Sequence, residues 1–153
     1  MRLNLYCIKL NEEKQTILVK EKGFNYKDDD FTQPENFILL LNTLFQLNRQ
    51  AEEYVYMIAL NAKKPIGIFE ISHGCLDSSL LNPREVYIKA LLCGACRIII
   101  CHNHPSGDPS PSSEDIVITN NLKEAGNILG LNLLDHIIIA DNNYFSFHRE
   151  NML

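Results

Sequence analysis

The segment RIIICHNHPSGDPSPSSED, residues 97–115, decides how this chain folds. It opens with an apolar run that ends at His102 and has the composition of a strand buried on both faces of a sheet. Residues 105–111 are too rich in proline and glycine to form anything but a loop. Ser112 then occupies the place of a helix N-cap, three residues before Asp115. The segment therefore predicts a strand, a stiff loop and a helix in direct succession.

Helices and strands are also predicted on both sides of that segment. Apolar residues at helical spacing predict an amphipathic helix over residues 34–48, with Thr32 as its N-cap. Asn82 and Pro83 predict the start of a second helix, and a third is expected over residues 113–129. Strands are predicted at residues 3–8, 16–20, 54–60, 65–71, 97–102, 133–140 and 144–148. Helices interleaved with strands and hairpins predict an α/β fold, in which helices flank a mixed β-sheet.

The length of 153 residues suits one domain with a modest extension. Residues 20–30 are charged and include Gly23, which favours a linker. We therefore expect residues 1–30 to form a short N-terminal extension with two strands and a linker, and residues 31–153 to form the main domain. A chain of this length can bury roughly 68–70% of the surface that it exposes when unfolded, which leaves room for a recessed site.

Composition and charge exclude several classes of protein. The sequence is 46% hydrophobic and 22% charged, with a formal net charge of −5, and its lysines and arginines form no cluster. Non-specific nucleic-acid binding is therefore disfavoured, because it depends on a basic face. No apolar run approaches the roughly 20 residues of a membrane span, and the N-terminus lacks the features of a signal peptide. The number of cysteines, five, is odd, which disfavours a framework of disulfides. Together these features predict a cytoplasmic protein with reduced thiols and no membrane association.

The chemistry is concentrated around two histidines. His102 and His104 are separated by one residue at the end of a strand, so both imidazoles can project to the same side. Asp115 lies in the first turn of the next helix, which the loop can fold back over the strand end. Two imidazoles and one carboxylate make the open three-ligand set of catalytic zinc. The alternatives are two surface histidines and a capping box between Ser112 and Asp115, and the latter is compatible with a metal because a carboxylate has two oxygens.

The spacing of these residues resembles a known family. His102-x-His104, seven residues, Ser112, two residues and Asp115 is similar to the JAMM motif of the JAB/MPN metalloproteases. The string HNHPSGDPSPSSED, followed by LLDHIII, resembles the RadC branch of that family, over about residues 31–153. The resemblance implies a JAB/MPN, cytidine-deaminase-like fold, with a curved mixed sheet, helices on either side and zinc at the sheet edge. It also implies that His102, His104 and Asp115 are ligands of Zn²⁺ and that Ser112 stabilises the oxyanion of the reaction.

The family pattern also requires a glutamate well upstream, at the start of a strand, to act on the attacking water. Glu53, which opens the run EYVYMIAL, matches best. Glu52 is one position away and would point to the other face of a strand, so it is the weaker choice. Glu70 ends the next strand and is a distant third. The alternative for Glu53 is a solvated charge between a helix and a strand.

The activity implied is zinc-dependent hydrolysis of a peptide or isopeptide bond in a peptide or protein substrate. A second hypothesis is a DNA-repair or DNA-processing accessory, the role that the RadC name implies. The acidity of residues 34–153 opposes it, and residues 1–33 are too few to form the helix-hairpin-helix-like segment of longer RadC proteins. A third is a non-catalytic MPN binding module, which the intact ligand positions disfavour. The substrate, the oligomeric state and the choice between zinc and another metal, such as iron, stay open.

Two further signals compete with the metal site. Cys93 and Cys96 form a C-x-x-C pair, but they close a helix, whereas a thioredoxin-like pair opens one. We expect these thiols to be small residues of the core. His136, which follows Asp135 at the opening of a strand, is expected to be structural.

Overall fold

The computed structural model describes residues 1–27, 31–62, 64–74 and 81–153. Seven strands and three α-helices are found in these four stretches, in the order β1 (Arg2–Leu10), β2 (Thr16–Asn25), α1 (Pro34–Phe45), a 3₁₀ turn (Leu47–Arg49), β3 (Glu53–Asn61), β4 (Lys64–Gly74), α2 (Pro83–Leu92), β5 (Arg97–Asn103), α3 (Ser113–Leu129), β6 (Asn132–Ile139) and β7 (Tyr144–Ser146). The α/β class predicted from the sequence is confirmed.

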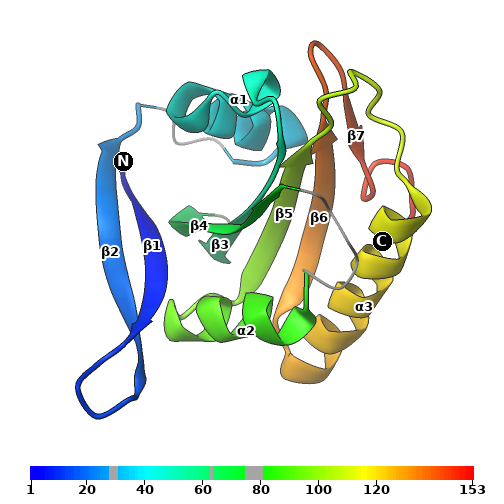
Figure 1. The fold of residues 1–153 in the computed structure, drawn as a ribbon. Coiled ribbons are helices and arrows are strands. Elements are labelled where there is room, and N and C mark those ends of the chain that lie inside the picture. The colour runs from blue at the N-terminus through cyan, green and yellow to red at the C-terminus, as the bar shows by residue number, and fades with distance from the viewer. Residues whose placement is uncertain (28–30, 63, 75–80) are drawn as a thin grey trace.

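All seven of these strands belong to one mixed sheet, in the order β2-β1-β4-β3-β5-β6-β7. Strands β1 and β4 are parallel, as are β5 and β6, and the other neighbours are antiparallel. The hairpin β3–β4 is the one expected from the sequence. In Figure 1 the sheet runs from the blue hairpin β1–β2 to the red strand β7, with α1 on one side and α2 and α3 on the other.

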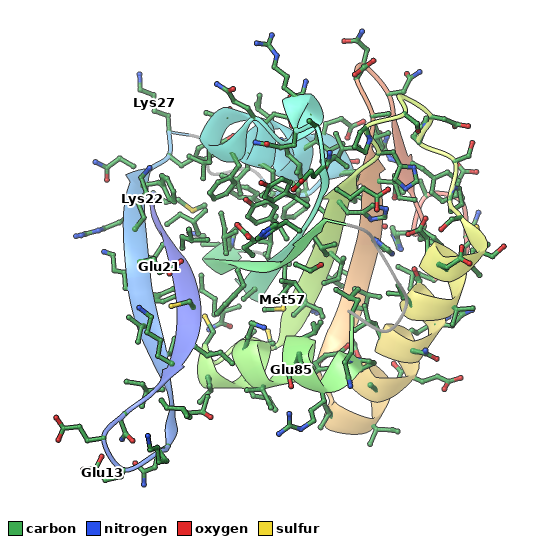
Figure 2. All side chains as sticks on the ribbon, in the orientation of Figure 1. Glu13, Glu21, Lys22, Lys27, Met57 and Glu85 are labelled. Atoms are coloured by element: carbon green, nitrogen blue, oxygen red, sulfur yellow. The ribbon has the colours of Figure 1, made fainter. Side chains whose placement is uncertain are left out.

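The alternation of apolar residues along the central strands explains this layering. In β3, Tyr56, Ile58 and Leu60 pack in one buried cluster with α1, whereas Val55 and Met57 pack in a second with α2 and α3. Because successive side chains of a strand point to opposite faces, a run that is apolar throughout fits a sheet covered on both sides. Figure 2 shows Met57 between the sheet and α2.

The N-terminal hairpin extends this sheet. Strand β1 pairs with β4 through Leu5 and Ile68, and Leu3 is buried in the same cluster as α1. The prediction of a linker at residues 20–30 is wrong for its first part, because β2 continues to Asn25. Its charged residues are exposed on a strand that has a neighbour on one side only, and residues 28–30 lie outside the described part of the chain.

The first helix is shorter than predicted. It ends at Phe45 because Gln46 adopts a left-handed conformation, with φ 52°, and a separate 3₁₀ turn follows. Its N-cap is Gln33 and not Thr32. The third helix agrees with the prediction: Ser112 and Asp115 form the capping box, and Gly130, with φ 68°, ends it.

Helix α3, which carries Asp115, is fixed against α2 at a close contact. The Tyr87 hydroxyl donates to the carbonyl of Leu122 at 2.7 Å, and a Cβ at Gly126 would lie 2.4 Å from the same hydroxyl oxygen. A side chain at position 126 would therefore push the helices apart. None of the helices in the four described stretches is long and apolar enough to cross a membrane.

Candidate metal centre

Three potential ligands meet at the carboxyl end of β5. His102 is a residue of this strand, His104 directly follows it, and Asp115 lies in the first turn of α3. The capping box seats Asp115 over the strand end, as the sequence predicts. One ligand atom from each of the three residues lies within 4.8 Å of the others.

The distances within this group suit a tetrahedral metal ion. The Nε2 atoms of His102 and His104 are 3.0 Å apart. Asp115 Oδ1 is 3.2 Å from His102 Nε2, and Asp115 Oδ2 is 3.6 Å from His104 Nε2. Ligand atoms bound tetrahedrally to zinc at 2.0–2.1 Å are about 3.3 Å from one another. The observed separations lie on both sides of that value.

The orientation of His104 is fixed by the backbone. Its Nδ1 lies 2.8 Å from the carbonyl oxygen of Asp108. Because a carbonyl can only accept, Nδ1 carries the proton and donates it. The neutral ring then presents the lone pair of Nε2 to His102 and Asp115. This is the second hydrogen bond that metal-binding histidines in proteins normally make.

The two oxygens of Asp115 have different partners. Oδ2 accepts from the backbone N–H of Ser112 at 2.8 Å and from its hydroxyl at 2.6 Å, whereas Oδ1 faces His102. Burial alone would raise the pKa of Asp115, but the imidazoles of His102 and His104, which donate to the carboxylate when they are protonated, hold that pKa well below its usual range. The same carboxylate would accept from a protonated His104, and this is the largest cause of the raised pKa of His104. The site therefore holds a carboxylate that attracts positive charge.

Two glutamates line the cavity in front of this group. Its volume is about 730 Å³, and its wall includes Glu52, Glu53, Ser112 and His104. The negative charge of Glu53 contributes to the raised pKa of His104, which agrees with the two lying close together. Glu52 was expected to face away, but it lies in a bend before β3, where strand alternation does not apply.

Glu70, the third candidate, lies elsewhere. Its carboxylate is 2.9 Å from His73 Nδ1 and accepts from the Tyr56 hydroxyl at 3.4 Å. Glu70 is not one of the described residues that line the cavity. Its contacts account for it without a role at the metal site.

Sequence reasoning missed Asn103, which lies between the two histidines and is 2% exposed. Its side-chain oxygen accepts from the backbone N–H of Tyr54 at 2.8 Å, and its amide donates to the carbonyl of Glu52 at 3.0 Å. These bonds hold the backbone on both sides of Glu53 against β5. A buried asparagine at a strand end is the signal that could have indicated such a tie.

His136 and Thr119 were also missed. His136 Nε2 lies 2.8 Å from His102 Nδ1, on the side away from the metal site, and its own Nδ1 lies 2.7 Å from the Thr119 hydroxyl. Burial lowers the pKa of His136 well below its usual value, and a positive charge on His102 would lower that pKa further. The sequence does contain one clue, since Thr119 lies four residues after Asp115, on the same face of α3.

The cysteines that the structure describes take no part in this group. Cys101 is buried, as expected of a core thiol, but Cys96 is exposed, and its sulfur accepts from the backbone N–H of Ala62 at 3.2 Å. The prediction that the C-x-x-C thiols lie in the core is therefore wrong for Cys96. Cys93 is half-buried at the end of α2, and Cys75 lies outside the described residues.

Comparison with known proteins gives a consistent result. A family model described as RadC-like JAB domain matches residues 31–152. A UPF0758 protein of Clostridium novyi is 52% identical over 103 residues, which cover 67% of this chain and 45% of the relative. UPF0758 proteins of Alkaliphilus metalliredigens and Clostridium beijerinckii are 50% and 41% identical, over 67% and 82% of this chain and 44% and 55% of their own lengths. The chain thus spans about half the length of the curated relatives it matches.

Proposed function

Since this chain belongs to the RadC-like JAB domain family, we propose that it is a zinc-dependent hydrolase that cleaves a peptide or isopeptide bond. One observation carries the proposal. The Nε2 atoms of His102 and His104, 3.0 Å apart, point with the Asp115 carboxylate to one place at the wall of an open cavity. Three electron-rich groups in this arrangement repel one another unless a cation lies between them. Two imidazoles and one carboxylate are a ligand set that catalytic zinc uses.

His102, His104 and Asp115 would hold the ion. When bound there, zinc supplies a Lewis acid that polarises a carbonyl and lowers the pKa of water to about 7. The reaction consumes one water, whose oxygen bonds to the carbonyl carbon of the substrate as the carbon–nitrogen bond breaks. The remaining steps depend on side chains of this chain.

Glu53 would move the proton. Its carboxylate accepts a proton from the attacking water and passes it to the leaving amine, so that neutral amine and carboxylic acid are released. The place of Glu53 in the wall of the cavity, next to Ser112 and His104, supports this role. Asn103 keeps the start of β3 in position through its bonds to Tyr54 and Glu52.

Ser112 would stabilise the oxyanion. Its hydroxyl now donates to Asp115 Oδ2 at 2.6 Å, so in this role it turns toward the cavity as negative charge develops on the substrate oxygen. The backbone N–H of Ser112 also donates to Asp115 Oδ2, and this bond can hold Asp115 while the hydroxyl is turned toward the substrate. Hydrogen-bond donors of this kind typically contribute a few kcal/mol to lowering a barrier, roughly 3 to 4 in measured cases.

The first test separates metal binding from chemistry. Untagged protein is expected to contain about one zinc per chain by mass spectrometry. His104→Ala and Asp115→Ala should both lose it. Glu53→Gln should keep zinc but lose hydrolysis of a mixed library of linear and lysine-linked isopeptides. Glu70→Gln is the matched control, since Glu70 lies on a neighbouring strand with its own partners, and it should keep both properties.

Each alternative has its own outcome. A folded wild-type protein that takes up no zinc would overturn the proposal and favour the capping box alone. A zinc-loaded protein that cleaves no member of the library would leave the non-catalytic binding module. If Glu53→Gln is fully active, Glu53 is not the group that moves the proton.

A further inference from the structure

We propose that Thr119 and His136 are positioning residues that fix the proton of His102 on Nδ1, so that its Nε2 lone pair faces the metal site. This inference rests on the proposed metal site for its consequence, although the hydrogen bonds themselves are independent of a metal. Both residues are 1% exposed, which removes solvent as a competing partner. They lie behind His102, between β5, β6 and α3.

The donor and acceptor in each of these hydrogen bonds can be assigned by starting from Thr119. Its hydroxyl oxygen is 2.6 Å from the backbone carbonyl oxygen of Asp115. Two oxygens at this distance share a proton, and only the hydroxyl has one to give. Thr119 therefore donates to Asp115. A threonine hydroxyl has a single proton, so it must accept in its other contact, at 2.7 Å from His136 Nδ1.

The orientation then follows for both histidines. His136 donates from Nδ1 to Thr119, and burial favours its neutral ring, so its Nε2 carries a lone pair. That Nε2 lies 2.8 Å from His102 Nδ1, which must therefore supply the proton. Nε2 of His102 is left as the atom that faces Asp115 and His104. The ring of His136 is held flat against Phe147, with centroids 5.1 Å apart and planes 9° from parallel.

His102 and His104 thus reach the same state in two ways. His104 donates directly to a backbone carbonyl, that of Asp108. His102 instead donates to His136, which in turn donates to Thr119. The chain that begins at His102 ends on the carbonyl of Asp115, the residue that supplies the third ligand. One hydrogen-bonded path therefore links two of the three ligand residues behind the site. We expect such partners to affect metal affinity, because they set the orientation and basicity of the ligand.

Removing the hydroxyl should weaken metal binding without removing a ligand. In Thr119→Val the metal-bound protein would leave the His136 Nδ1–H buried without its acceptor, which has an energetic cost. The other tautomer of His136 would put a proton on His102 Nε2, where it competes with the metal. Zinc affinity is therefore expected to fall by about 10-fold or more, within the range of about 10- to 100-fold typical of such partners.

The experiment compares Thr119→Val with Thr119→Ser, which restores the hydroxyl. Zinc affinity is measured by competition with a chromophoric chelator, and the tautomers by NMR on protein labelled with ¹⁵N-histidine. In the wild type, with and without zinc, His136 should show a protonated Nδ1 and an unprotonated Nε2. The exposed ring of His73 is an internal reference. Thr119→Val should lose affinity and change the His136 signals, and Thr119→Ser should recover both.

A second pair of variants keeps the test decisive if Thr119→Val does not fold. His136→Gln offers an oxygen that can accept from His102 Nδ1, whereas His136→Leu offers none, so the glutamine variant should bind zinc more tightly. Equal zinc affinity within a pair whose two members both fold would overturn the inference, and so would unchanged His136 signals in a folded Thr119→Val protein. A wild type without zinc affinity but with the expected tautomers would overturn the proposed function and uphold the assignment of the hydrogen bonds.

Discussion

Two buried carboxylates lie on opposite faces of the sheet, in contrasting surroundings. Asp115 is 2% exposed and faces two imidazoles. Asp135 is 5% exposed and accepts from the Ser146 hydroxyl at 2.6 Å and from the backbone N–H of His148 at 3.0 Å. The pKa of Asp115 lies below its usual range, whereas burial raises that of Asp135. Burial alone therefore does not identify a functional carboxylate, and its partners do.

The two faces also separate neighbours in the sequence. Asp135 and His136 are adjacent in β6, and strand alternation directs them to opposite sides of the sheet. His136 contacts His102, while Asp135 lines a cavity of about 300 Å³ next to the start of α1. The Asp-His pair in the string LLDHIII is thus not one functional unit. Each residue belongs to a different layer.

The largest expected effect is on metal binding, and it should be confined to one carboxylate. Asp115→Asn should weaken zinc binding by more than about 100-fold, because it removes a charged ligand. Asp135→Asn, the same change on the other face, should leave zinc content and affinity unchanged. Both are measured by metal analysis and chelator competition. If a folded Asp135→Asn protein lost zinc, Asp135 would also be needed for metal binding, and the contrast between the two carboxylates would be wrong.

A smaller effect is expected on stability, at the other carboxylate. Ser146→Ala removes a hydroxyl that donates to Asp135, a bond to a charged group in a buried place. Its loss should lower the free energy of unfolding by about 1.5–3 kcal/mol, with zinc affinity unchanged. Ser113→Ala, at an exposed serine, is the control and should change neither. Denaturant titration of the three proteins checks this, and equal stabilities would show that the bond contributes nothing.

The smallest effect is a difference in pH dependence in metal-free protein. The folded pKa of Asp115 is lowered, so its contribution to stability is present above the unfolded value of about 3.9 and is lost on acidification. The folded pKa of Asp135 is raised, so its contribution is present below about 3.9 and is lost as the pH rises through the folded value.

Chemical denaturation from about pH 3 to about pH 7, with a chelator present, measures both contributions. The stability difference between wild type and Asp115→Asn should grow as the pH rises. The difference between wild type and Asp135→Asn should change in the opposite direction. Parallel curves for the two variants would contradict the opposite pKa shifts.

The parts of the site whose residues lie close together in the sequence could be predicted from it. His102, His104, Ser112 and Asp115 fall within fourteen residues, and the structure brings them together. The capping box of α3 was visible in the spacing of Ser112 and Asp115. Such features depend on local backbone geometry, for which residue type and spacing are sufficient.

Features that depend on pairing between distant strands could not be predicted. The contact of His136 with His102 follows from the parallel register of β5 and β6, which places His136 opposite Ile100. No local pattern encodes that register. The end of α1 was missed for another reason, since Gln46 adopts a left-handed conformation that usually signals glycine.

The second half of strand β2 was predicted to be part of a linker because of its charged residues, and those charges have a consequence for the whole sheet. It is one of the two outermost strands, and Lys20, Glu21 and Lys22 are exposed along it, with Lys22 labelled in Figure 2. An open edge is a template on which other chains can add strands and aggregate, and charged side chains oppose that growth. At the far edge, β7 has only three residues and offers little to extend. Both edges of this sheet are therefore poor starting points for aggregation.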